Sequence, residues 1–212
     1  MASEVVLLDL LHSPFATRVR IALAEKEVEF ESREEDLSNK SPLLLKMNPV
    51  NKQIPVLIHK GKPICESLVI VEYIDEVWNH KSPLLPSHPC LRAHARFWGD
   101  YIDKKIYPAG RMLGTSSDHE VKEASKKELI EIFKVLEGEL GDKPYYYVAI
   151  IPYYSFFHTF ETLGNFSFEA ECPKLVSWAK RCMQKTSVSK SLCDQHKVYE
   201  VVLELKKKFG VE

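Results

Sequence analysis

The stretch Lys52–Trp78, KQIPVLIHKGKPICESLVIVEYIDEVW, decides the fold that we predict for this chain. An apolar strand at Pro55–His59 is followed by a K-G-K turn signal and a second short strand, Pro63–Cys65, which together indicate a β-hairpin. After Ser67 the apolar residues recur at the spacing of an α-helix as far as Trp78. The stretch therefore predicts a hairpin that runs directly into a helix.

The junction between this hairpin and the helix carries Glu66 and Ser67. A helix start presents unpaired backbone N–H groups, and here they would lie beside a hydroxyl and a carboxylate. The combination suits a ligand with both a carboxylate and an amine, since the N–H groups and Ser67 can bind the anion while Glu66 binds the cation. The alternative is that Ser67 only caps the helix, which is a common role for serine.

The order IPVL, turn, strand, Glu-Ser and helix resembles the glutathione-binding half of glutathione transferases, most closely that of the plant tau class. The resemblance implies a thioredoxin-like domain in which the Ile54 main chain, Pro55, Glu66 and Ser67 contact the tripeptide. In that family a cis peptide bond precedes the proline that matches Pro55, and proline is the residue for which this isomer costs least.

Composition narrows the class of protein. The chain has 212 residues, 45% of them hydrophobic, and a formal charge of −1, which fits one or two soluble domains and argues against nucleic acid as a partner. Its five cysteines form no CxxC and no zinc spacing, so we expect reduced thiols and no metal. We find no membrane-length apolar run and no signal-peptide pattern, and we expect a cytoplasmic protein.

The residues before the hairpin predict a β-α-β unit and a short helix, which gives residues 1–78 the order β-α-β-α-β-β-α. The predicted elements are strands at Val5–Leu11 and Val28–Ser32, a helix from Pro14 to about Lys26, and a helix at Leu43–Met47 capped by Ser41.

Ser13 lies in the turn before the first helix, where it either caps that helix or faces a ligand. Ser13-Pro14-Phe15 resembles the S-P-F motif of the tau class, which implies that Ser13 is the catalytic serine. A hydroxyl that donates to the glutathione sulfur, aided by the helix end, would lower the thiol pKa and stabilise the thiolate. A cysteine here would instead form mixed disulfides, so serine favours a transferase.

Two further positions bear on the glycine carboxylate of glutathione. Lys40 matches the lysine that meets this carboxylate in the family, although a single surface lysine is usually only solvated. Tau-class chains usually have two lysines before Ile-Pro, whereas this chain has Lys52-Gln53. Gln53 offers a neutral donor there, and a charged hydrogen bond is worth about 1 kcal/mol more. We therefore expect weaker glutathione binding.

Three prolines within residues 79–89 predict a linker, and residues 90–212 predict an all-α bundle. The predicted helices are Cys90–Leu113, ended or kinked at Pro108; a long helix that starts at a Ser117–Glu120 capping box and stops at Gly141; Val148–Phe160; Pro173–Lys185; and Ser191–Phe209.

In the family the hydrophobic co-substrate lies between the S-P-F turn and the first helix of this bundle. The matching residues are Phe15, Tyr107, Arg111 and Phe209. A phenol and a guanidinium there could stabilise charge that develops as the thiolate adds to an electrophile. The alternative is that Phe15 and Tyr107 pack in the core and Arg111 is solvated.

The chain departs from its relatives after Lys143-Pro144-Tyr145, where a glycine-rich turn and a capping residue are missing. Roughly ten residues are absent, judged against ordinary loop lengths. We therefore predict an irregular first turn in the helix that follows, with Pro152 near its start, and a stability lower than that of relatives.

The resemblance spans nearly the whole chain and implies a homodimeric enzyme that joins glutathione, as co-substrate, to hydrophobic electrophiles in detoxification and the stress response, with hydroperoxide reduction as a side activity. A second hypothesis is a weakly catalytic carrier of apolar ligands, which Gln53 and the missing segment make reasonable. A third, a thiol-disulfide oxidoreductase, is disfavoured because its nearest candidate thiol, Cys65, has no partner cysteine beside it.

Overall fold

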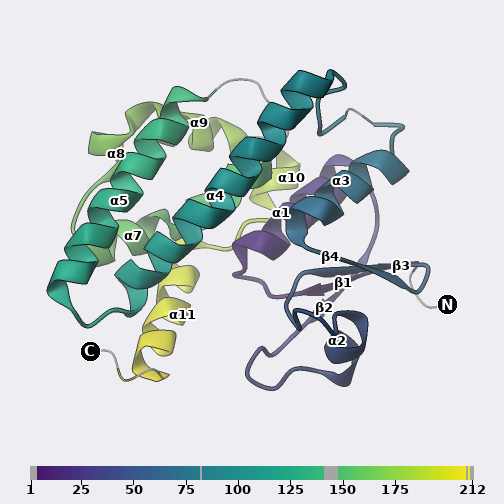
Figure 1. Cartoon of the computed structure of the whole chain (residues 1–212), viewed down its shortest axis with the longest axis horizontal. Helices are drawn as coiled ribbons and strands as arrows, with labels where there is room; N and C mark the ends of the chain where they lie inside the picture. Colours follow the sequence, from purple (N-terminus) through teal and green to yellow (C-terminus); the bar gives the residue numbers. More distant parts are fainter. Residues whose placement is uncertain (1–3, 82, 141–147, 209, 211–212) are drawn as a thin grey trace.

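Four strands in the first third of the chain form one mixed sheet (Figure 1). The computed structural model describes residues 4–81, 83–140, 148–208 and 210. The strands are β1 (Val5–Asp9), β2 (Glu31–Glu34), β3 (Val56–His59) and β4 (Lys62–Cys65), in the sheet order β2-β1-β3-β4. β1 pairs parallel to β2 and antiparallel to β3, and β3 pairs antiparallel to β4. This confirms the predicted thioredoxin-like arrangement.

The β3–β4 hairpin turns on Lys60 and Gly61, whose φ angles are 51° and 77°. Positive φ at both central residues is the geometry of a type I′ turn, which follows the natural twist of the two strands. The predicted hairpin is confirmed, with Lys62 in the strand instead of the turn. The Ile54–Pro55 peptide bond is cis, as the resemblance implied.

Helices α1 (Pro14–Glu25), α2 (Pro42–Met47) and α3 (Ser67–Val77) accompany the sheet. Both α1 and α2 begin with proline behind a capping serine: Ser13 Oγ accepts from Ala16 N at 3.3 Å, and Ser41 Oγ accepts from Leu44 N at 3.0 Å.

The strands alternate between two cores, as the period of a strand requires. Leu7 and Leu57 pack with residues of α1 and α3, whereas Leu8 and Val56 pack in a second core with Leu44 of α2. The sheet is therefore covered on both faces.

The predicted strand Val28–Ser32 is wrong by about three residues, because β2 spans Glu31–Glu34. After α1 the chain turns with Glu27 at φ 55°, and Val28 N–H donates to Leu23 O. Pairing with β1 begins only at Glu31, opposite Val6. Val28 and Phe30 are partly buried against the core. The alternation of apolar and polar residues at 28–32 therefore arises from this packing and not from strand pairing.

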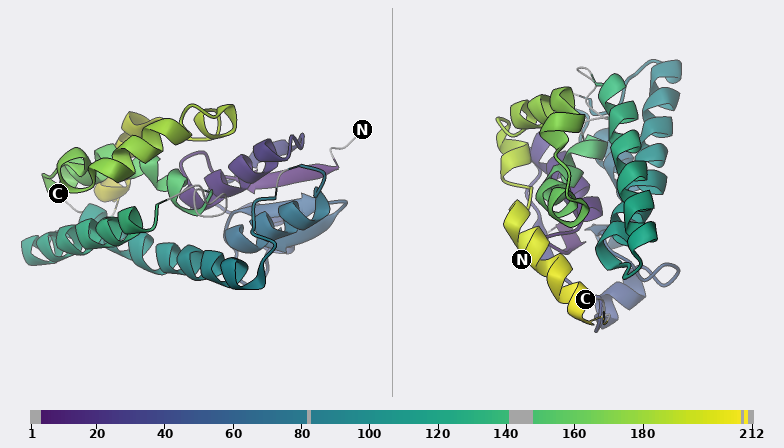
Figure 2. Two further views of the ribbon diagram at one scale, coloured as in Figure 1. Left: turned by 90° about the horizontal axis from the view of Figure 1, so that it is seen from above. Right: turned by 90° about the vertical axis from the view of Figure 1, so that its left-hand side faces the viewer.

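Every regular element after α3 in the described residues is helical, which confirms the predicted bundle. These elements are α4 (Pro89–Thr115), α5 (His119–Gly138), the 3₁₀ helix η1 (Ile151–Phe156), α7 (Phe157–Gly164), α8 (Phe168–Glu171), α9 (Pro173–Cys182), α10 (Thr186–Ser189) and α11 (Gln195–Lys208). Figure 2 shows α4 and α5 as two long helices side by side. None of the helices described here is long and apolar enough to cross a membrane.

Two predictions for the long helices need correction. Of the two outcomes predicted for Pro108, an end of the helix is wrong, since α4 continues from Pro89 to Thr115, while a kink stays a prediction. The buried neighbours Ile106 and Ala109 pack in the core on either side of the proline, and this packing outweighs the backbone hydrogen bond that proline removes.

The cap of α5 is Asp118 and not Ser117. Asp118 Oδ1 accepts from the N–H groups of Glu120 and Val121 at 2.8 and 3.3 Å. A carboxylate also interacts favourably with the positive end of the helix, an advantage that a serine hydroxyl lacks. The helix ends at Gly138, so the predicted stop at Gly141 is three residues too late.

The predicted helix Val148–Phe160 is divided. Residues 148–150 are helical, a 3₁₀ segment runs over Ile151–Phe156, and α7 starts at Phe157. The irregular beginning that we predicted is thus confirmed, while the lower stability stays a prediction. The preceding residues, 141–147, lie outside the described part of the chain.

The last two predicted helices are shorter than expected. The Pro173–Lys185 prediction ends at Cys182, and α11 begins at Gln195 instead of Ser191. Asp194 Oδ1 accepts from the N–H groups of His196 and Lys197, which fixes that start. The short helices α8 and α10 were not predicted.

The segment between α3 and α4 is tied to the sheet domain by Asp75. The Asp75 carboxylate lies 2.7 Å from Lys26 Nζ and accepts from the N–H groups of Leu84 and Leu85 at 2.8 and 3.0 Å. We propose residues 1–78 and 90–212 as two domains joined by this segment, because all four strands precede it and only helices follow it in the residues described.

Replacing Asp75 by asparagine should destabilise the protein by about 3–5 kcal/mol, because fully buried Lys26 loses its carboxylate partner. Burial raises the pKa of Asp75, but the hydrogen bonds from Lys26, Leu84 and Leu85 outweigh it and leave the pKa below its usual value. A lowered pKa stabilises the fold above the unfolded value, and that stability is lost as pH falls through the folded pKa. Urea unfolding should therefore show the full penalty at pH 7 and a smaller one below about pH 4.

The matched control is Glu76→Gln, which neutralises an exposed carboxylate on the same helix. Its unfolding midpoint should stay close to that of the unaltered chain at every pH. Equal midpoints for the two variants at pH 7 would contradict the role assigned to Asp75.

Candidate active site

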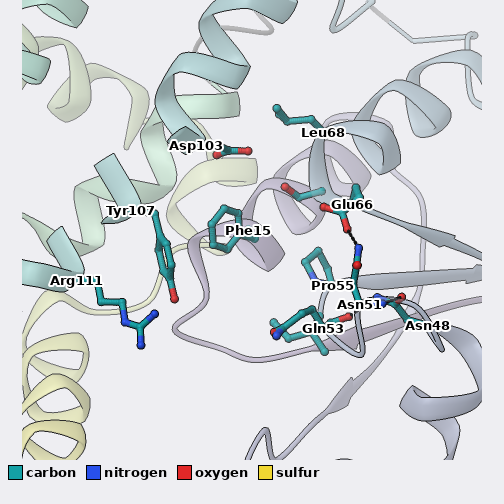
Figure 3. Close-up of a pocket in the computed structure, with 12 residues that line it drawn as sticks. Phe15, Asn48, Asn51, Gln53, Pro55, Glu66, Leu68, Asp103, Tyr107 and Arg111 are labelled. Atoms are coloured by element: carbon teal, nitrogen blue, oxygen red, sulfur yellow. Dashed lines mark hydrogen bonds between the residues drawn. The ribbon is translucent and has the colours of Figure 1, made fainter. Parts of the chain in front are cut away.

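A pocket of about 630 Å³ lies where the sheet domain meets α4 (Figure 3). Residues from three segments of the chain form its wall: Phe15 from α1; Asn48, Asn51, Gln53, Ile54, Pro55, Glu66, Ser67 and Leu68 from the stretch that runs from the end of α2 into the first turn of α3; and Asp103, Tyr107 and Arg111 from α4. Figure 3 shows the aromatic residues Phe15 and Tyr107 facing a polar side made by Asn51, Gln53 and Glu66.

The polar side is fixed by two asparagines. Asn48 is 3% exposed, donates from Nδ2 to Gln53 O at 3.0 Å, and accepts at Oδ1 from Asn51 N–H at 3.1 Å. Asn51 then donates from Nδ2 to Glu66 Oε1 at 2.7 Å. Glu66 has φ 69° and stands directly before the first residue of α3. An exposed carboxylate is thus held at the pocket wall.

Ser67 is held from behind by Arg18, a residue of α1 with no exposed surface. Arg18 Nη1 donates to Ser67 Oγ at 3.1 Å and to Asp103 Oδ2 at 2.9 Å, and Arg18 also donates to Ala149 O from Nε and Nη2. Because the Ser67 oxygen already accepts from Arg18, its own proton can be donated into the pocket. Ser67 is therefore suited to bind an anion.

The apolar side consists mainly of Phe15 and Tyr107, whose ring centroids lie 5.3 Å apart in a T-shaped contact. Phe15 also covers the Arg18 guanidinium, with Cζ 5.5 Å from the ring centroid. Arg111 follows Tyr107 by one helical turn and is exposed at the rim. The alternative for Tyr107, complete burial in the core, is excluded because the residue is 46% exposed.

Ser13 ends the turn after β1 and is 7% exposed. Arg20 holds this turn, since it pairs with Asp9 Oδ1 at 2.6 Å and donates to Leu11 O at 2.7 Å. Ser13 caps α1, but its oxygen acts there only as an acceptor, so its proton remains available to a ligand. Capping and ligand binding are therefore compatible at this residue.

Two of the described residues that were predicted for the site do not line the pocket. Ser13 precedes the lining residue Phe15 by two positions, and Lys40 is half-buried on the segment before α2. Phe209 lies outside the described residues. The other predicted residues, namely Phe15, Gln53, Ile54, Pro55, Glu66, Ser67, Tyr107 and Arg111, all line the pocket.

Sequence reasoning missed Asn48, Asn51, Leu68 and Asp103. The two asparagines sit in a short loop, and side chains of this type often bond to nearby backbone, which is a usable signal. Asp103 had no local signal, because its partner Arg18 is 85 residues away in sequence.

Cysteine chemistry is disfavoured at this site. Burial, followed by the neighbouring charge of Glu66, raises the pKa of the Cys65 thiol, which keeps it protonated and a weak nucleophile. Within the described residues no group of three or more His, Cys, Asp or Glu side chains is placed to hold a metal ion.

Comparison with known proteins agrees with this geometry. The family model described as "Glutathione S-transferase, N-terminal domain" matches residues 3–76. A probable glutathione S-transferase parC of Nicotiana tabacum is 61% identical over 218 positions, covering 99% of this chain and 98% of the relative. The chain therefore belongs to the glutathione S-transferase family.

Two solved structures show which class of the family the chain resembles. Rice GST1 (OsGSTU1), solved in complex with glutathione, is 44% identical with a TM-score of 0.93, and covers 98% of this chain and 100% of its own. A tau-class glutathione S-transferase from mango, Mangifera indica, is 38% identical with a TM-score of 0.90, and covers 97% of this chain and 100% of its own. Membership of the plant tau class follows from these likenesses.

The comparison also bears on the missing segment. The alignment with the tobacco relative spans 218 positions although it includes 99% of a 212-residue chain, so about eight positions of the relative have no counterpart here. That number is near the roughly ten residues that we expect to be absent. Their location before Val148 stays a prediction.

Proposed function

We propose that this chain adds the thiolate of glutathione to hydrophobic electrophiles. The observation that carries the proposal is the pocket itself, in which Gln53, Glu66 and Ser67 lie opposite Phe15 and Tyr107. The polar side offers donors and a carboxylate for a zwitterionic peptide, and the aromatic side offers a surface for an apolar acceptor. One cavity can thus hold the two reactants next to each other, which removes most of the entropic cost of their encounter.

Glutathione binds, in this proposal, along the polar side. Its γ-glutamyl ammonium pairs with Glu66, its α-carboxylate accepts from Ser67 and from the N–H groups that open α3, and its cysteine lies against Ile54 and Pro55. Its glycine carboxylate meets Lys40 and Gln53. The two charged ends of the tripeptide are then bound on either side of the thiol.

Ser13 activates the sulfur. The hydroxyl proton, free because Ser13 Oγ only accepts from Ala16 N, is donated to the thiolate. A hydrogen bond to the charged form and the N-terminal end of α1 both lower the thiol pKa, so that more thiolate is present at neutral pH. The thiolate attacks the electrophile, and Ser13 itself forms no covalent bond.

The acceptor lies against Phe15 and Tyr107, with Arg111 at the rim and Phe209 from the C-terminal end of the chain. Negative charge that develops on the acceptor can be stabilised by the Tyr107 hydroxyl and the Arg111 guanidinium. The same thiolate can attack a peroxide oxygen, breaking the O–O bond and releasing the alcohol, and a second glutathione would convert the resulting sulfenic acid to the disulfide and water. This would give hydroperoxide reduction as a side activity. A carrier role without catalysis is disfavoured by the likeness to named transferases over the full chain.

We also propose a homodimer that forms through α3 and α4. Large apolar side chains are exposed there, with Val69, Leu91 and Phe97 at 55%, 57% and 57%. The ion pair between Arg96 and Glu72, 2.6 Å apart, joins the two helices into one face. A second copy of the chain that covers this face would remove these side chains from water.

A cytoplasmic location is the last part of the proposal. All five cysteines are free thiols, although Cys65, Cys90 and Cys182 retain exposed surface. Free thiols are stable in a reducing compartment.

Ser13→Ala should lower kcat/KM for glutathione with a chloronitrobenzene acceptor by about 10- to 100-fold near pH 6.5, the value of one hydrogen bond to a charged group. The bound thiol would have a higher pKa in the variant, so the acidic limb of the pH–rate profile should move to higher pH. The loss should therefore shrink above about pH 9, where the thiol ionises without help.

The control for helix capping is Asp118→Ala, which removes the cap of α5, a residue that does not line the pocket, at a similar cost in stability, about 1 kcal/mol. It should leave the pH–rate profile in place. A profile that is unchanged in Ser13→Ala as well would refute the role of Ser13.

Gln53→Lys should tighten glutathione binding about fivefold, because a charged donor replaces a neutral one opposite the glycine carboxylate. Calorimetric titration at low salt gives the dissociation constant. The gain should fall in 0.5 M salt, since the new interaction is exposed to solvent. An unchanged constant at low salt would count against the placement of Gln53.

Phe97→Asp should convert the dimer to a monomer, because it puts a charge in the middle of the apolar face. Analytical ultracentrifugation should report the mass of two chains before the change and of one after it. Leu45→Asp is the matched control, since Leu45 is 40% exposed on α2, which packs on the opposite face of the sheet from α3. Loss of the dimer in both variants, or in neither, would overturn the proposed interface.

A further inference from the structure

We infer that Asn51 is a positioning residue that orients the Glu66 carboxylate, and that the pair selects thiol peptides with a free α-amino group. This inference rests on the proposed binding of glutathione along the polar side of the pocket. It assigns a role to a residue that neither the sequence motifs nor the proposed mechanism uses.

The contact itself joins two separate segments. Asn51 Nδ2 lies 2.7 Å from Glu66 Oε1, across 15 residues of sequence, and both side chains line the pocket (Figure 3). Glu66 is exposed and has a long side chain, which in water would sample several rotamers. A hydrogen bond from a fixed donor restricts that freedom before any ligand arrives, and such preorganisation favours binding.

Asn51 is a fixed donor because Asn48 holds its loop. The Asn51 N–H donates to Asn48 Oδ1, Asn48 Nδ2 donates to Gln53 O, and the Lys52 N–H donates to Asn48 O at 2.9 Å. Lys52 also has φ 53°, which turns the chain sharply after Asn51. The loop is thus bonded on both sides of Asn51, and Asn48 itself is 3% exposed.

The chemistry of an amide suits this role better than that of a charged donor. An amide N–H directs the carboxylate without neutralising it, so Glu66 remains available as the anion for an ammonium group. Asn51 occupies one oxygen, Oε1, and leaves Oε2 for the ligand. A lysine in the same place would compete with the ligand ammonium for the carboxylate.

The expected selectivity follows directly. A peptide with a free α-ammonium gains a charge-assisted hydrogen bond to the oriented carboxylate. A peptide with hydrogen in place of that amine makes no such bond, and the Glu66 carboxylate then stays hydrated. The preference for the amine should therefore depend on Asn51.

The test compares glutathione with its des-amino analogue, glutaryl-cysteinyl-glycine, at a saturating concentration of a chloronitrobenzene acceptor. The first measurement uses the unaltered chain, which should show a lower KM for glutathione than for the analogue. Asn51→Leu, of similar size but without donors, should raise KM for glutathione about five- to tenfold. It should leave kcat and the KM of the analogue nearly unchanged, so the preference largely disappears.

Three further measurements separate positioning from a structural effect. Asn51→Gln, which keeps an amide, should restore part of the preference. In a Glu66→Gln background, Asn51→Leu should have no additional effect on KM. Asn79→Leu, the same change at an exposed position after α3, should alter neither substrate's kinetics, and unfolding midpoints should be recorded for every variant.

The outcomes distinguish the inference from the function on which it rests. If the unaltered chain does not prefer glutathione to the analogue, the proposed role of Glu66 is wrong and the inference fails with it. If that preference exists and survives in Asn51→Leu, or if both substrates lose equally, the proposed function stands and the role of Asn51 is overturned.

Discussion

Arg18 joins α1 to the start of α3 and to two parts of the helical domain through one buried guanidinium. Its guanidinium has no exposed surface and bonds to Ser67 at the start of α3, to Asp103 on α4, and to the carbonyl of Ala149. Removing this charge from water is costly, and an ion pair recovers that cost only when its geometry satisfies most donors. Hydrogen bonds to three segments meet that condition. Because these bonds are directional, they also fix how the helical domain sits against the sheet domain, which nondirectional packing does less well.

The pocket depends on that arrangement, since its polar side belongs to the sheet domain and Tyr107 and Arg111 belong to α4. Arg18 contacts both the apolar and the polar side of the pocket. Its guanidinium packs under the Phe15 ring, and it donates a hydrogen bond that orients the Ser67 hydroxyl. A small rotation of one domain would therefore disturb the anion-binding hydroxyl and the acceptor surface together. Arg20 plays the corresponding part for Ser13, because it binds Asp9 and the Leu11 carbonyl and so holds the turn that carries the serine.

Local signals predicted the fold well where each residue's neighbours in sequence decide its conformation. The K-G-K turn, the caps Ser13 and Ser41, and the helix after Ser67 depend on contacts within a few residues, and all of them appear. Errors arose where distant packing decides the outcome. β2 pairs three residues later than its alternation suggested, and α4 continues through Pro108 because Ile106 and Ala109, before and after the proline, are buried in the core. The family resemblance supplied the pocket residues, whereas Asp103 and Asn51 required the three-dimensional contacts to Arg18 and Glu66.

The two ends of the proposed glutathione site differ in the charge of the residues that line them. At the γ-glutamyl end the proposed ligand meets a carboxylate, Glu66, together with Ser67, whose hydroxyl is polarised by Arg18. At the glycine end Gln53 offers only a neutral donor at the pocket wall. Lys40 is half-buried and belongs to a separate segment, before α2. Charged hydrogen bonds exceed neutral ones in strength, so among the residues of the pocket wall the stronger contacts should lie at the γ-glutamyl end. Asn48, Asn51 and Arg18 hold the residues at the γ-glutamyl end in fixed positions. Such rigidity is needed there, because the strongest contacts to the ligand must also set the position of its sulfur at Ser13.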